Sequence, residues 1–329
     1  MPQPSYAYAS ARLAALSTKV LSAAAIRRLA DGSFDDAMRA LLDIRYGNVP
    51  DATGADIERM IDNERRRTAD EIREISPDPE LTDLLLLAAD VHNLKVLIKA
   101  RLLDTSDFAF LEGGLYGREL LEKAVASADY RALPAWLCEA LDALEAKLRV
   151  GADPQTISLL LDRAYLSHAR QAAKTAGEPF IGRYFAAMCD FGNLLTIFRL
   201  RAMGVPSEDM RDMLLPDGQI AARKLLAACE PSDEAVLNLL PSGALKAAVA
   251  RGLADMQKTG NIGALERERD NYLLSLVREH KRDTLTIFPV VGYYLARDRE
   301  AKAVRLILTV KKNGLDDAVI QERLRELYG

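Results

Sequence analysis

Cysteine, histidine and tryptophan are scarce in this chain, and their scarcity limits the chemistry open to it. The 329 residues include three cysteines, three histidines and one tryptophan. Cys138, Cys189 and Cys229 are odd in number and widely spaced, which argues against a disulfide framework or a zinc site and favours free thiols in a reducing compartment. No two histidines have the HExxH or HxxxH spacing of a metal site, so we expect no bound metal.

Nucleotide-binding and nucleophile motifs are also missing. The sequence contains no GxxxxGK[ST] loop and no glycine loop between a strand and a helix. Such loops present the backbone N–H groups that hold phosphates. No serine or cysteine stands on a nucleophile elbow. The sequence therefore predicts no cofactor.

Long apolar runs are absent as well. The longest purely apolar run, from Leu84 to Ala89, is far shorter than the roughly 20 residues that a membrane-spanning helix needs. The first residues lack the basic region and the apolar core of a signal peptide. We expect a cytoplasmic chain without direct transmembrane insertion.

Neither sign of charge dominates. Forty-four basic and 48 acidic residues leave a net charge of −4. Non-specific binding of nucleic acid needs a basic face that neutralises phosphates, so we expect no nucleic-acid partner. The chain is 49% apolar and 28% charged, which is typical of a folded soluble protein.

One pattern occurs three times, at spacings of 100 and 110 residues. An acid is followed by an apolar residue four places later, by an apolar pair seven and eight places later, and by a base eleven places later. These steps fall on one side of an α-helix, so each copy predicts an amphipathic helix. The acids, the bases and the two asparagines that follow the first two acids are Asp90, Asn93, Arg101, Asp190, Asn193, Arg201, Glu300 and Lys311.

A threefold pattern at this spacing predicts an internally repeated protein. Asp62 and Asp162 support the register, because each lies 28 residues before the acid of its copy. No alternating strand pattern of useful length is present, so we predict an all-α fold. The three repeats are expected over residues 1–104, 105–204 and 205–329.

Local signals predict several helix ends. Ser33 and Asp36 form a candidate capping box at the start of a helix. Pro289 lies inside the apolar segment 286–296, where we expect a kinked or interrupted helix. Asn313 and Gly314 are typical of a helix C-terminus.

The repeated acids and bases have two interpretations each. The acids could form a catalytic group, but equivalent positions in three repeats more often perform one structural task three times. The bases suit helix C-termini. Alternatively, they could face a common axis.

The chain resembles one known family through several segments taken in order. These are residues 6–16, the Asp-x-x-Asn-Leu segments at 90–94 and 190–194, and the closing segment 299–308. Together they are similar to the C subunit of archaeal and bacterial V-type (A-type) rotary ATPases, which is the counterpart of the d subunit of eukaryotic V-ATPases. The resemblance covers essentially the whole chain. Ala303 departs from it, because the family often has asparagine there.

The resemblance implies a funnel of three helical repeats around a pseudo-threefold axis. It implies a non-catalytic subunit that couples the rotating central stalk to the membrane rotor ring for ion transport. The expected partners are the D-type and F-type stalk subunits and the rotor ring. The expected location is peripheral, on the cytoplasmic face of the membrane. The repeated polar residues would mark the repeat and could lie near the stalk socket.

Two alternatives of other classes follow from the residues alone. One is a free-standing α-helical scaffold that binds a helical partner in a groove. The other is an enzyme that uses the column of acids as its active site.

Overall fold

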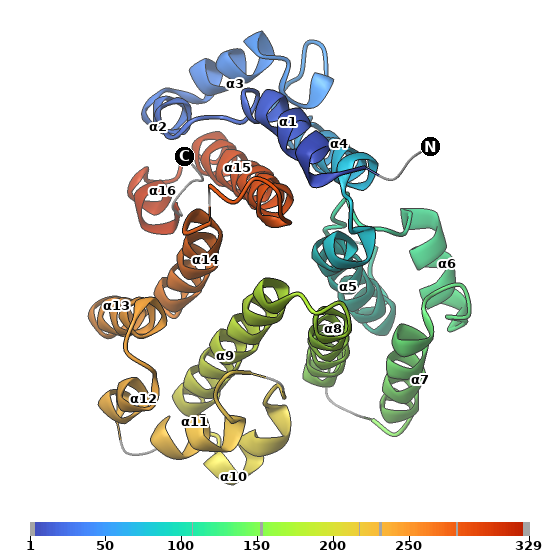
Figure 1. Cartoon of the computed structure of the whole chain (residues 1–329), viewed down its shortest axis with the longest axis vertical. Helices are drawn as coiled ribbons and strands as arrows, with labels where there is room; N and C mark the ends of the chain where they lie inside the picture. Colours follow the sequence, from blue (N-terminus) through green and yellow to red (C-terminus); the bar gives the residue numbers. More distant parts are fainter. Residues whose placement is uncertain are drawn as a thin grey trace. The chain divides into compact units, whose positions relative to one another are not determined.

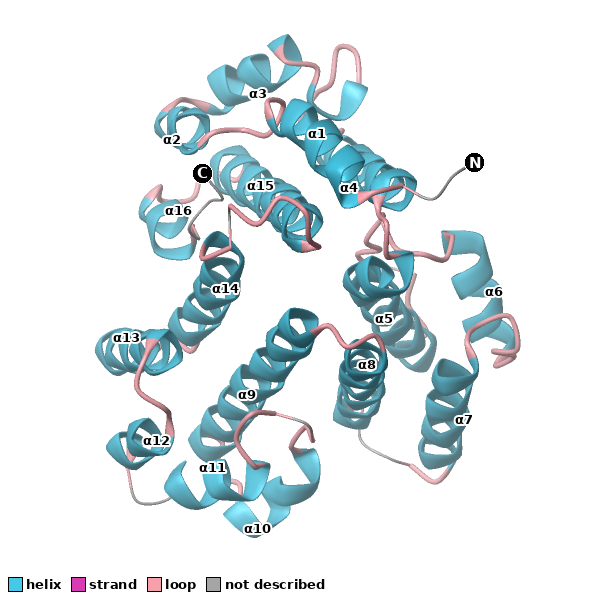
Figure 2. Ribbon diagram, viewed as in Figure 1, coloured by secondary structure: helices cyan, strands magenta, loops and turns pink. Residues whose placement is uncertain are grey.

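All regular secondary structure in the described part of the chain is helical. The computed structural model describes residues 4–106, 108–151, 154–216, 218–229, 232–280 and 282–324, and these ranges contain no β-strand. Figure 2 shows helices joined by loops throughout these ranges. The predicted all-α fold is confirmed.

The chain divides into two compact units, and the boundaries fall inside two long helices. Unit 1 comprises residues 1–85 and 274–329, and unit 2 comprises residues 86–273. Figure 1 labels the α-helices of unit 1, which are α1 (Tyr6–Ser17), α2 (Ala23–Asp31), α3 (Phe34–Asp43), α4 (Ile57–Ile75), α15 (Phe288–Lys312) and α16 (Ala318–Arg323). The 3₁₀ turn η1 (Tyr46–Asn48) lies between α3 and α4.

Unit 2 contains the remaining helices and the larger parts of the two long ones. They are α5 (Pro79–Leu103), α6 (Arg118–Ser127), α7 (Ala135–Arg149), α8 (Gln155–Thr175), α9 (Pro179–Ala202), α10 (Ser207–Met210), the 3₁₀ turn η2 (Arg211–Met213), α11 (Ala222–Cys229), α12 (Asp233–Leu239), α13 (Ala244–Thr259) and α14 (Gly263–Arg278). The repeat boundaries at residues 104 and 204 remain a prediction.

Helix ends follow the local chemistry of the sequence. The side chain of Ser33 accepts the N–H of Asp36, and the Asp36 carboxylate accepts the N–H of Ser33, so the predicted capping box is confirmed. Helix α15 ends at Lys312, and Gly314 follows with φ of +62°. This left-handed conformation is one that glycine adopts without strain.

The expected interruption at Pro289 is wrong. Pro289 lies in the first turn of α15, and the helix continues through the third copy of the pattern to Lys312. A first-turn residue has no helical acceptor for its N–H, so proline costs little there and its fixed φ suits the helix. The segment that begins at Phe288 and the third pattern helix are one element.

Helix α15 is the centre of unit 1. It packs against α1, α2, α3, α4 and α16 (Figure 1). Its predicted apolar residues Val304, Ile307 and Leu308 are buried, together with Leu41 and Met60 of neighbouring helices. A helix that is covered from several directions is stabilised mainly by tertiary packing.

Unit 2 has its own core around α9. The antiparallel helices α8 and α9 pack side by side (Figure 1), and α7 packs against α8. Phe185 and Phe191 of α9 are fully buried, and so are Leu94 and Ile98 of α5. Cys189 is a buried free thiol and Cys138 a partly buried one, while the side chain of Cys229 lies outside the described residues.

Unit 1 also contains a buried cluster of charged side chains. Arg297 of α15 is 4% exposed and pairs with Glu64 of α4 and with Glu300 of its own helix. The Glu64 carboxylate also accepts the backbone N–H of Gly47 at 2.8 Å. The Arg297 Nε donates to the hydroxyl of Thr68 at 3.3 Å. The cluster joins α15 to α4, and through Glu64 to η1, by buried ion pairs and hydrogen bonds.

Replacing Arg297 with alanine should destabilise the protein strongly. The substitution leaves Glu64 and Glu300 buried without their cation, which typically costs about 3–5 kcal/mol. Arg305→Ala is the matched control on the same helix, because Arg305 pairs with an exposed carboxylate, that of Glu58. An exposed pair contributes at most about 1 kcal/mol. Urea denaturation of both variants measures the difference, and equal losses would contradict the assignment.

Candidate functional site

The first acid and asparagine of the repeated pattern hold the loop that follows their helix. The Asp90 carboxylate accepts the backbone N–H groups of Leu115 at 2.8 Å and Tyr116 at 3.2 Å. The side-chain amide of Asn93 donates to the carbonyl of Leu111 and accepts its N–H, both at 2.8 Å. Both side chains are fully buried. We call this arrangement of acid, asparagine and following loop a loop clamp.

A second loop clamp lies on α9. The Asp190 carboxylate accepts the N–H groups of Gln219 and Ile220, both at 3.1 Å. Asn193 donates to the carbonyl of Leu215 at 3.0 Å and accepts its N–H at 2.6 Å. The same two side-chain types, three residues apart, therefore satisfy loop backbone groups in the same way in both copies.

The chemistry of the clamps is structural. A carboxylate that accepts two backbone N–H groups in a buried site holds the loop, and it has no substrate-facing position. Burial raises the pKa of Asp190 to about 6, while the N–H groups of Ile220 and Gln219 and the charge of Arg170 lower it by less. Among the residues that the structure describes, no group of three potential metal ligands is found. We interpret these acids as loop anchors.

Two glycines belong to the clamps, and the repeated pattern did not point to them. A Cβ atom on Gly114 would overlap the carboxylate of Asp90, and one on Gly218 would overlap that of Asp190. Each glycine lies two residues before the second anchored N–H. Their shared spacing from that position could have identified them, but glycines in loops have many other causes.

The three bases each pair with an acid of their own unit. Arg101 contacts Glu145 at 2.6 Å, and Tyr130 donates its hydroxyl to the same carboxylate at 2.6 Å. Arg201 contacts Asp233 at 2.8 Å, and Lys311 contacts Asp317 at 3.3 Å. These pairs give each base a local role. A common axis for the three bases remains a prediction.

An apolar groove in unit 2 was not anticipated from the sequence. It has a volume of about 660 Å³ and lies among the C-terminal ends of α5 and α9, the first turns of α8 and α14, and the loop at η2. Its apolar lining includes Leu102, Leu103, Leu159, Leu195, Leu200 and Met203. Leu103 is 73% exposed and Met203 is 66% exposed. Large apolar side chains at this exposure, gathered in one hollow, are typical of an interaction surface.

Charged groups border this groove. Lys99 donates to the hydroxyl of Ser158 at 3.1 Å, and Arg199 pairs with Glu266. The second loop clamp supports one wall, because Leu215 lies in the lining and is held by Asn193. In the sequence, the groove is indicated only by the apolar residues that directly follow the repeated bases at the helix ends. Exposure cannot be read from that pattern.

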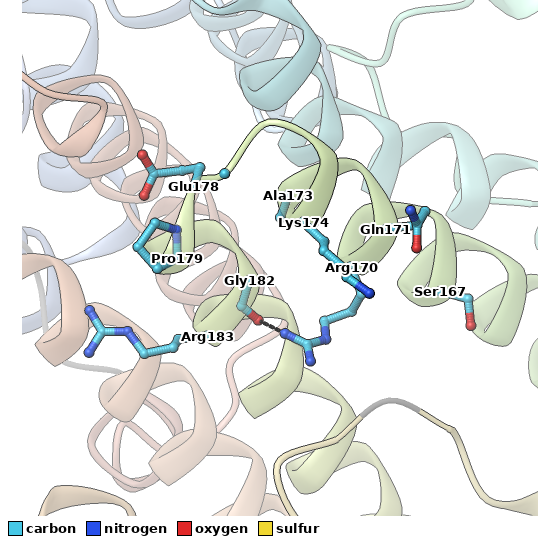
Figure 3. A pocket seen from close by; sticks show the side chains of 10 residues that line it. Ser167, Arg170, Gln171, Ala173, Lys174, Glu178, Pro179, Gly182 and Arg183 are labelled. Atoms are coloured by element: carbon cyan, nitrogen blue, oxygen red, sulfur yellow. Dashed lines mark hydrogen bonds between the residues drawn. The ribbon is translucent and has the colours of Figure 1, made fainter.

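A second hollow lies at the turn between α8 and α9 and contains three bases. Arg170 donates to the carbonyl of Gly182 at 2.6 Å and so ties the two helices together (Figure 3). Figure 3 shows Arg183 extending to the side of α9 away from α8, while Arg170 turns toward Gly182. The bases do not converge on one point, so this hollow is a weaker candidate site than the apolar groove.

Comparison with known proteins identifies the family. The family model described as ATP synthase (C/AC39) subunit matches residues 9–323. The chain belongs to this family. It is a C-type subunit of a V-type or A-type ATPase, as the sequence resemblance predicted.

Relatives from bacteria and archaea agree along nearly the whole chain. The chain is 27% identical to the C subunit of the V-type ATP synthase of Thermus thermophilus, over 97% of this chain and 98% of the relative. It is 26% identical to the C subunit of the A-type ATP synthase of Thermococcus kodakarensis, over 98% and 91% of the two chains. It is 23% identical to the C subunit of the V-type sodium ATPase of Enterococcus hirae, over 84% of each chain.

Family membership decides the class of function. The C subunit is a non-catalytic stalk subunit of the ATPase complex, so the enzyme hypothesis for the column of acids is wrong. Its place in the complex is that of a peripheral subunit. In the described ranges, no helix has the length and apolar character needed to cross a bilayer.

Gly114→Ala should loosen the first loop clamp. The added methyl group displaces the Asp90 carboxylate from its two N–H donors, and we expect a loss of about 2–4 kcal/mol from overlap and lost bonds. Gly117→Ala is the control, because nothing lies within 4 Å of a Cβ there. As an N-cap change it should cost about 0.5 kcal/mol. Guanidinium denaturation compares the two, and similar losses would argue against the clamp.

Asp190 should make stability depend on pH. Its folded pKa of about 6 lies above the ordinary 3.8, so the folded state binds this proton more tightly. Its contribution is complete below about pH 4 and is lost as pH rises through about 6. A shift of about two units corresponds to roughly 3 kcal/mol. Denaturation midpoints from about pH 4 to pH 8 should show this slope in the wild type, and Asp190→Asn should show a smaller slope because the contribution of Asp190 is gone. Parallel profiles would refute the assignment.

Proposed function

We propose that this chain couples the rotating central stalk of its ATPase to the membrane rotor ring. Membership of the C-type family supports a role in the stalk. A coupling under torque must hold its partners through every turn, which requires extensive and well-packed contacts. The apolar groove of unit 2 is the observation that carries the proposal, because it offers such a contact on a peripheral subunit.

We assign the groove to the stalk. Leu103 and Met203 project at helix ends around an apolar floor, and Lys99 and Arg199 stand at the border. Apolar anchors on one face of a partner helix fit a groove of this kind. The partner is therefore expected to present a helical tip with apolar residues.

The first experiment tests the partnership itself. The purified chain would be mixed with the D-type and F-type stalk subunits of the same cell and examined by size exclusion with light scattering. A stable one-to-one assembly supports the coupling role. A chain that stays monomeric beside folded stalk subunits counts against it and favours the free-standing scaffold, which would use the same groove for another helical partner.

Leu103→Asp should weaken stalk binding about tenfold or more, because it places a charge in the centre of an apolar contact. Val150→Asp is the matched control, since Val150 is 85% exposed in unit 2 and does not line the groove. Isothermal titration with the stalk subunits measures both variants. If Leu103→Asp binds the stalk subunits normally but no longer binds the isolated ring, the groove is the contact for the ring and not for the stalk.

A further inference from the structure

In both loop clamps the anchored N–H lies at the same distance before a short helix, and the third acid of the pattern binds an N–H at that distance too. Asp90 binds the N–H of Tyr116, which lies two residues before the start of α6, and Asp190 binds the N–H of Ile220, two residues before the start of α11. Glu300 accepts the N–H of Leu21 at 2.6 Å. Leu21 lies two residues before the start of α2.

The third acid thus anchors a segment from the opposite end of the sequence. Glu300 and Leu21 are 279 residues apart, whereas Asp90 and Asp190 bind loops 25 to 30 residues after themselves. In each case a pattern helix holds the entry to a short helix. Helix α2 therefore corresponds to α6, which follows α5, and to α11, which follows α9.

Ala303, which departs from the asparagine column, fits this arrangement. Asn93 and Asn193 bind Leu111 and Leu215, each seven residues before the next short helix. Seven residues before α2 is Leu16, which lies inside α1. The backbone groups of a helix residue already have partners within the helix or at its end. An asparagine at 303 would have no loop backbone to satisfy.

The change from aspartate to glutamate also fits. Gly114 and Gly218 allow the short aspartate side chains to lie close to the loop backbone. The corresponding residue two places before Leu21 is Lys19, which carries a Cβ. A longer acid reaches the N–H of Leu21 from farther away. Arg297 of the same helix holds the second oxygen of this carboxylate.

We infer that unit 1 contains a third loop clamp, completed across the two ends of the chain, in which Glu300 is a clasp that holds the N-terminal helices on α15. The repeat then begins at each pattern helix. Its copies are residues 79–178, residues 179–287, and residues 288–329 taken together with 1–78.

The clasp is strengthened by the buried cluster beside it. Arg297 joins Glu300 to Glu64, and Glu64 holds the N–H of Gly47. The N-terminal segment is therefore attached to α15 at Leu21 and along α4, and Glu64 of α4 in turn holds η1. In this copy the segment that α15 holds is not the segment that follows α15 in the sequence. These contacts therefore hold the two parts together, where the other two copies have a continuous chain. This inference does not rest on stalk binding.

Hydrogen exchange on the isolated full-length chain tests the clasp. Glu300→Ala should raise exchange in residues 18–31 about tenfold or more, because a charge-assisted bond to the Leu21 amide is lost. Exchange in segments 111–127 and 215–229 should stay as in the wild type. Asp90→Ala should raise hydrogen exchange in 111–127 and leave exchange in 18–31 as in the wild type.

Two further variants keep the test decisive. Glu300→Asp retains the charge but is too short to reach Leu21, so it should also speed exchange in 18–31 even if Glu300→Ala does not fold. Glu58→Ala removes an exposed acid that pairs with α15 and should leave 18–31 unchanged. Unchanged exchange in 18–31 with Glu300→Asp, or equal effects from Glu58→Ala, would overturn the inference.

Discussion

The backbone N–H groups that lie just before several short helices need hydrogen-bond acceptors, and both units are built to supply them. Their hydrogen bonds to the long helices are partly or fully buried, and an unsatisfied buried N–H costs about as much as a lost hydrogen bond. A carboxylate on the long helix solves the problem for two adjacent N–H groups at once. Asp90 and Asp190 are both completely buried, and burial raises the pKa of Asp190.

The buried charged side chains of unit 1 are likewise satisfied by hydrogen bonds and ion pairs, and each has several partners. A buried ion pair often adds little net stability relative to a well-packed apolar core, but the loss of one member is costly. Arg297 touches two carboxylates and a hydroxyl, so few other arrangements of α15 against α4 could satisfy it. Burial raises the pKa of Glu300, and the nearby Arg297 and the Leu21 amide oppose that effect. The cluster therefore favours one specific packing.

A stalk subunit has to combine a rigid frame with exposed contacts, and unit 2 shows how the two are related. The loop that supplies Leu215 to the groove is held by Asn193 and Asp190 on α9. Arg163 of α8 holds the same loop further upstream, through the carbonyls of Asp212 and Leu214. One groove wall is therefore fixed by buried polar bonds, while Leu103 and Met203 remain exposed.

The residue pattern alone predicted the helical fold and the three pattern helices, because periodicity and capping are local properties. The family was indicated by the resemblance of several ordered segments and is shown by the family match. The stripe through Leu94 and Ile98 is buried as its spacing predicts. The expected interruption at Pro289 is wrong because a proline in a first turn and a proline inside a helix look alike when the start of the helix is not known. Three features follow only from the folded chain: Glu300 binds Leu21, Gly114 makes room for Asp90, and Leu103 is exposed. Each of these depends on which residue approaches from a distant part of the chain, and helical periodicity carries no information about that.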